Sequence, residues 1–155
     1  MAVPTALVSA GCTGGAGSDA ARAAAVPTPS AQAAALCRAL HRELPGSVDG
    51  LRRRAADPPS DFTAVWGDPA VRLRCGVPRP ALLDPGSPRF RPDADAAEVN
   101  GVEWLTEKLD DGYRFTTVLR KAFVEVTVPR RYAPEVNPLL DLAAAVRRTV
   151  PVGVV

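Results

Sequence analysis

The three cysteines and the single histidine are the residues of this sequence most able to do chemistry. Cys12, Cys37 and Cys75 are far apart in the chain, and no Cys-x-x-Cys or His-Glu-x-x-His pattern accompanies them. Because metal sites need clustered ligands, we expect neither a metal nor a cofactor. His41 lies in a basic stretch, and the spacing of serines and aspartates around it does not indicate a Ser-His-Asp arrangement. We therefore assign no catalytic residue.

Pairs of acidic residues offer a second kind of chemistry. Asp93 and Asp95 form one pair, and Asp110 and Asp111 form another. Both pairs fall in segments expected to be loops or turns, where solubility explains them. An acid/base pair of carboxylates is the alternative, and two carboxylates that face each other in a concave pocket would favour it.

Cys12 ends a short leader, residues 1–12, of small and apolar residues that finishes Ser-Ala-Gly-Cys. This leader is similar to the end of a bacterial lipoprotein signal, in which the cysteine is acylated and becomes the mature N-terminus. It departs from that pattern at Ser9, where leucine is usual, and in lacking a basic segment. The alternative is an alanine-rich leader with an incidental cysteine. Residues 13–29 are mostly small and polar, and they predict a flexible tether.

The central strand is predicted at Val71–Cys75, where apolar and polar residues alternate strictly before Gly76. Cys75 therefore points to the core. A helix capped by Ser30 carries Cys37 on its apolar stripe, so this sulfur is buried as well. We infer a Cys37–Cys75 disulfide and an oxidising compartment. The alternative is two free thiols in one core.

The remaining elements complete an α+β fold. A hairpin is predicted over 102–109 and 113–120, a further strand over 121–128, and a helix that Asn137 caps. The order predicts a two-layer sandwich, a mainly antiparallel sheet of about four to five strands with an N-terminal and a C-terminal helix. The folded domain is expected over 30–150, and residues 151–155 form a short apolar tail.

A candidate binding surface lies around the central strand. It consists of one aromatic residue and three arginines: Trp66, Arg72, Arg74 and Arg79. Residues 77–97 are proline-rich and predict a long loop that would form one wall of such a surface. Trp66 is alternatively a core residue. The arginines at 52–54 either hold an anionic group or form a solvated face.

The composition excludes several classes of protein. The chain has 155 residues, 46% hydrophobic and 23% charged, which is ordinary for one globular domain. The net charge of +2 is too small to indicate nucleic-acid binding. The sequence also lacks a run of about 18 apolar residues, so we expect no membrane-spanning helix.

These features together resemble an uncharacterised actinobacterial family, the domain of unknown function 3515. The blocks that carry the resemblance are Cys37 with Leu44-Pro45, the arginines at 52–54, Trp66-Gly67-Asp68-Pro69, Leu73–Pro80, Gly101–Trp104 and Val124–Pro129. The resemblance spans about residues 36–150 and implies a secreted protein or a lipoprotein. It supplies no activity, cofactor or catalytic residue.

From these observations we expect an extracytoplasmic, non-catalytic domain of the bacterial cell envelope. It is membrane-tethered through Cys12 or secreted, and it binds an envelope protein or a cell-wall component. The alternative is a small extracytoplasmic hydrolase that uses acidic residues.

Overall fold

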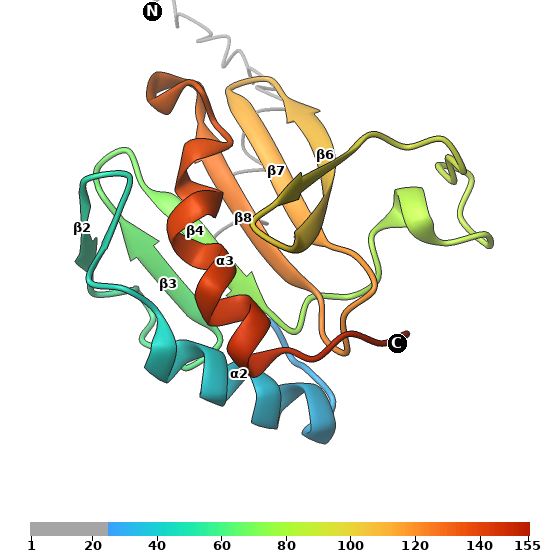
Figure 1. Cartoon of the computed structure of the whole chain (residues 1–155), viewed down its shortest axis with the longest axis horizontal. Coiled ribbons are helices and arrows are strands. Elements are labelled where there is room, and N and C mark those ends of the chain that lie inside the picture. Colours follow the sequence, from blue (N-terminus) through green and yellow to red (C-terminus); the bar gives the residue numbers. More distant parts are fainter. Residues whose placement is uncertain (1–24) are drawn as a thin grey trace, which may run out of the picture.

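The structure, a computed structural model, describes residues 25–155 (Figure 1). Within these residues it is an α+β fold, as predicted, with two α-helices and one antiparallel sheet. The elements in chain order are α2 (Ala31–Glu43), β1 (Ser47–Val48), β2 (Leu51–Arg54), β3 (Thr63–Trp66), β4 (Val71–Cys75), η1 (Ala81–Leu83), β5 (Ala96–Val99), β6 (Val102–Leu109), β7 (Gly112–Thr117), β8 (Val124–Pro129), η2 (Arg130–Tyr132) and α3 (Asn137–Thr149).

The sheet has eight strands, so the prediction of about four to five strands was wrong. Three strands escaped the sequence pattern because their signal is weak. β1 has two residues, β2 reads Leu-Arg-Arg-Arg, and β5 begins inside the segment expected to be a loop. Each of these strands is defined by pairing with a neighbour along the chain rather than by apolar alternation.

The strand order is β1-β2-β3-β4-β8-β7-β6-β5, which is two four-stranded meanders joined side by side. β4 ends the first meander and β8 ends the second, and these two strands pair antiparallel in the middle of the sheet. Because β5 lies at the far edge, residues 76–95 must run from the middle of the sheet to its edge. We call residues 76–95 the crossover segment.

One face of the sheet holds the core, and both helices lie on that face (Figure 1). Leu73 and Cys75 of β4 are in register with Val126 and Val124 of β8, and all four are buried. The sulfurs of Cys37 and Cys75 are bonded, with their Cα atoms 5.5 Å apart. The predicted disulfide is therefore present, and it ties α2 to the central strand.

The predicted N-cap is confirmed for α2 and is wrong for α3. Ser30 Oγ accepts a hydrogen bond from the Ala33 amide at 3.3 Å, so Ser30 is the N-cap of α2 as predicted. Asn137 is not the cap of α3, because the N-cap is Val136 and its side chain makes no capping bond. The Asn137 amide instead donates to the Pro134 carbonyl in the preceding turn.

Residues 25–29, the end of the predicted tether, lie against the domain. Pro27 is buried, and the carbonyl of Ala25 accepts a hydrogen bond from Arg74 at 3.1 Å. The leader with Cys12 and residues 13–24 lie outside the described residues.

Candidate functional site

The face of the sheet away from the helices is polar, and it is built by the residues that alternate with the core. Arg74 of β4 is in register with Glu125 of β8, which is in register with Thr116 of β7. In the neighbouring row, Arg114 of β7 is in register with Glu107 of β6. Successive side chains of a strand point to opposite faces, so these residues share one face. We call this the polar face.

Two ion pairs on the polar face are withdrawn from water. The Arg74 guanidinium donates to both carboxylate oxygens of Glu125, at 3.0 and 3.1 Å. Arg114 donates to Glu107 in the same two-pronged way, also at 3.0 and 3.1 Å. Their side chains are between 5 and 11% exposed. Such forked geometry compensates the cost of removing both charges from water, and it fixes the side chains in place.

The crossover segment packs against the polar face. Val77, Pro78 and Ala81 line a small cavity together with Thr116 and Glu125. Internal hydrogen bonds hold the segment in shape, including one from the Arg91 amide to the Leu82 carbonyl at 3.0 Å. The sequence placed a loop here as a possible wall of a binding surface, and the segment does line a hollow.

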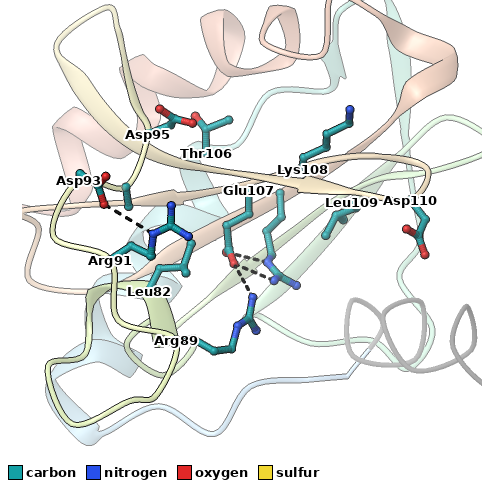
Figure 2. A pocket seen from close by; sticks show the side chains of 12 residues that line it. Leu82, Arg89, Arg91, Asp93, Asp95, Thr106, Glu107, Lys108, Leu109 and Asp110 are labelled. Carbon is teal, nitrogen blue, oxygen red and sulfur yellow. Dashed lines mark hydrogen bonds and ion pairs between the residues drawn. The ribbon is translucent and has the colours of Figure 1, made fainter.

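That hollow, of about 510 Å³, lies between the crossover segment and β6 (Figure 2). The Glu107–Arg114 pair forms part of its lining. Arg89 and Arg91 contribute two further cations from the crossover segment. Arg89 is 3.9 Å from Glu107, Arg91 is 3.6 Å from Asp93, and both arginine side chains are more than half exposed. Long ion pairs of exposed arginines contribute little energy, so both guanidinium groups can turn toward a bound acidic group.

The acidic residues of the hollow are Asp93, Asp95, Glu107 and Asp110. Glu107 accepts both prongs of Arg114. Figure 2 shows Asp95 and Asp110 at opposite ends of the drawn stretch of β6, so they do not face each other. Asp93 is 3.6 Å from the Arg91 guanidinium. Among residues 25–155, His, Cys, Asp and Glu side chains form no group of three that could hold a metal ion.

The four predicted surface residues do not come together. Trp66 is fully buried on the helix side of the sheet, where its indole nitrogen donates to the Pro45 carbonyl at 3.0 Å. It cannot line a binding surface, so its alternative role as a core residue holds. Arg72 and Arg74 are on the polar face, but Arg74 is engaged by Glu125. Arg79 is exposed in the crossover segment, with its guanidinium 5.7 Å from the centre of the Phe123 ring.

The residues that the sequence did not single out are Arg89, Arg91, Glu107 and Arg114. The sequence does indicate the face on which Arg114 lies, because Arg114 stands between Tyr113 and Phe115 in a predicted strand and points to the opposite face. Once the hairpin register is known, Glu107 is identified as the residue opposite Arg114. The two loop arginines carry no such signal, since the shape of the crossover segment brings them to the hollow.

The fold and the hollow together define a small, disulfide-bonded α+β domain with one open antiparallel sheet and a polar face that a long connection partly covers. The chain belongs to the family described as protein of unknown function (DUF3515), whose model matches residues 1–154. This establishes the resemblance noted from the sequence. No curated protein and no solved structure matches the chain. Within residues 25–155, neither helix is long and apolar enough to cross a membrane.

Proposed function

We propose that this protein is an extracytoplasmic, non-catalytic domain of the bacterial cell envelope, lipid-anchored through Cys12 or secreted. In this proposal it binds an acidic group of an envelope protein or a cell-wall component in the hollow beside the crossover segment. The location is supported by the Cys37–Cys75 disulfide, because structural disulfides persist in oxidising compartments and are rare in the cytosol.

The observation that carries the binding proposal is the pair of loosely held arginines in the hollow. Arg89 and Arg91 are positioned by a hydrogen-bonded loop, yet each guanidinium is exposed and makes only one long ion pair. A carboxylate or phosphate can accept two parallel hydrogen bonds from each guanidinium, and these bonds are shorter than the present ion pairs. The buried Glu107–Arg114 pair forms a rigid neighbouring wall. Arg72 is a further candidate contact, because Thr127 pairs with both Arg72 and Arg114.

The test compares two double variants with the same loss of charge. Arg89→Ala with Arg91→Ala removes the cations of the hollow, whereas Arg130→Ala with Arg131→Ala removes two exposed arginines of η2. We expect the first variant to bind insoluble cell-wall material or an envelope-protein fraction at least tenfold more weakly, since even one lost charge-assisted bond contributes about 1.5–3 kcal/mol. The control should bind like the wild type. Equal weakening in both variants would mean that only net charge matters, and the proposed site would be rejected.

The location is tested separately by the intact mass of protein extracted from envelopes. We expect a chain that begins at an acylated Cys12, or a secreted chain, lacking two hydrogens because of the disulfide. A chain recovered in the cytosol with all thiols free to react with an alkylating reagent would contradict the proposal.

A further inference from the structure

A groove of about 200 Å³ lies at the C-terminal end of the chain. Its walls come from the tail after α3, the turn between β7 and β8, and the crossover segment. We call it the C-terminal groove, and its large apolar side chains are Leu83, Val118, Leu119, Phe123, Val154 and Val155. It shares no lining residue with the hollow between the crossover segment and β6, so it is a separate feature of the surface.

The C-terminal groove lies on the polar-face side of the sheet. Phe123 stands two residues before Glu125, so alternation along the strand places its ring on the polar face. The Arg79 guanidinium lies 5.7 Å from the centre of that ring. Arg79 also donates a hydrogen bond to the backbone oxygen of Val155, which brings the C-terminal tail to the same side.

Apolar side chains of the groove are exposed to water. Within residues 25–155, six large hydrophobic side chains are exposed, and three of them line this groove: Leu119, Val154 and Val155, at 58 to 83% exposure. A hydrogen bond of 2.9 Å from the Gly153 amide to the Leu119 carbonyl joins the tail to the turn. Exposed apolar residues that gather in one place indicate a surface that contacts something outside the chain.

The backbone of Leu119 carries the inference furthest. Its φ of +55° is in the left-handed region, where a bulky side chain is an outlier and asparagine or glycine is favoured. The other two non-glycine residues with positive φ among residues 25–155, Asp49 and Asn100, are of the types that suit this conformation. Leu119 is 61% exposed, so packing within the fold does not explain a leucine at this position. A contact outside the chain does explain it.

The charges beside the groove are positive. The lining contains two arginines and no acidic side chain. The guanidinium of Arg120 donates to the Val150 and Gly101 carbonyls, so Arg79 is the arginine whose charge faces the groove. Lys121 adds a second exposed cation in the turn between β7 and β8.

Exposed apolar side chains next to cations match the surface of an anionic lipid bilayer, which offers phosphate headgroups above an apolar interior. They do not match a second copy of this chain. A two-fold contact would place the same patch on both partners, so cations would face cations without an acidic side chain in the lining to pair with them.

The position of the tether keeps the groove within reach of a membrane. A Cβ atom added to Gly76 would lie 2.4 Å from Pro29 Cβ, and the Gly76 amide donates to the Phe123 carbonyl at 2.9 Å. The chain therefore enters the domain beside the groove. Residues 13–24 separate Cys12 from the described chain, and they span at most about 40 Å when fully extended.

We propose that the C-terminal groove docks on the surface of an anionic lipid bilayer. Leu119, Val154 and Val155 enter the boundary between headgroups and acyl chains, and Arg79 and Lys121 contact the lipid phosphates. This inference rests on the lipid-anchored form of the proposed function, in which the anchor holds the groove near the membrane.

The first test measures co-sedimentation of the full chain with lipid vesicles. All proteins carry Cys12→Ser, so that no acyl chain contributes to binding. Vesicles of phosphatidylglycerol and phosphatidylcholine are compared with vesicles of phosphatidylcholine alone, and we expect tighter binding to the anionic vesicles. Leu119→Asn should remain folded, because asparagine tolerates positive φ, and should bind these vesicles at least about threefold more weakly. Leu140→Asn is the matched control, since Leu140 is 50% exposed on α3 and lies outside the groove.

The second test separates the groove from net charge. Lys121→Gln should weaken binding to the anionic vesicles about fivefold, whereas Lys108→Gln, at an exposed position of β6, should bind like the wild type. Absence of wild-type binding, unchanged binding in Leu119→Asn, or equal losses in a variant and its control would each overturn the proposal. Such a failure would leave the site at Arg89 and Arg91 standing, because that site is tested with cell-wall material or envelope protein in the absence of vesicles.

Discussion

Glu125 is a buried carboxylate whose removal would leave the buried charge of Arg74 without a partner. Its side chain is 5% exposed and accepts two bonds from Arg74, which is itself 8% exposed. Each charge is tolerated in the interior only because the other neutralises it. The predicted role of Arg74 as a free surface contact therefore gives way to a structural one, because its guanidinium holds β4 to β8 and also bonds the Ala25 carbonyl.

Glu125→Ala is expected to lower the free energy of unfolding by about 3–5 kcal/mol, because it leaves the Arg74 charge buried without its partner. Arg74→Met combined with Glu125→Leu removes both charges and should recover most of that loss. Urea unfolding measures both values, and Glu103→Ala at an exposed position of β6 is the control. A loss below about 1 kcal/mol for Glu125→Ala would mean that the pair is well solvated in solution.

At the scale of elements, the hairpin of β6 and β7 sets the register of the polar face. Its turn closes at Gly112, which has φ of +123° and is paired with Leu109 on one side and Pro129 on the other. A Cβ atom at Gly112 would lie 2.0 Å from the Val128 carbonyl oxygen and 2.8 Å from the Arg130 nitrogen. Both neighbours are backbone atoms, which cannot rotate away. Any side chain here therefore pushes β7 away from β8.

Gly112→Ala is accordingly expected to destabilise the protein by about 3 kcal/mol or more, since the clash adds to the cost of the unusual backbone angle. Gly50→Ala separates the two effects. Gly50 has φ of +74°, but its added Cβ would meet nothing within 4 Å, so we expect a loss of only about 1 kcal/mol. Similar losses in both variants, measured by denaturant unfolding, would contradict the steric explanation.

How far the sequence predicts these elements depends on whether local pattern or distant pairing defines them. The strand at 71–75 and the hairpin were predictable, because alternation and a glycine turn are local signals. The helix at Ser30 was predictable from its cap. β1 and β2 were not, because Leu51–Arg54 becomes a strand only by pairing with residues on both sides in the chain. The candidate site was harder still, since Arg89 and Glu107 meet only after the crossover segment has spanned half of the sheet.

At the scale of the whole molecule, one covalent bond joins the first helix to the middle of the sheet. The two meanders meet at β4 and β8, and Cys75 is the last residue of β4. Its bond to Cys37 closes a loop with a sequence separation of 38, which runs from the middle of α2 through β1, β2 and β3 to the end of β4. The bond therefore holds α2 against the middle of the sheet.

Replacing both Cys37 and Cys75 with alanine is expected to lower the free energy of unfolding by up to about 4 kcal/mol, because the unfolded chain regains the freedom of the closed loop. Both sulfurs are fully or almost fully buried, at 0 and 1% exposure, so the cysteine side chains contribute packing as well as the bond. Wild-type protein unfolded in urea with a strong reductant separates the two contributions, because reduction removes the bond and keeps the sulfur atoms. The alanine variant should not respond to the reductant. If reduction leaves the wild-type midpoint unchanged, the two sulfurs act as apolar core atoms, and the main support for an oxidising compartment is lost.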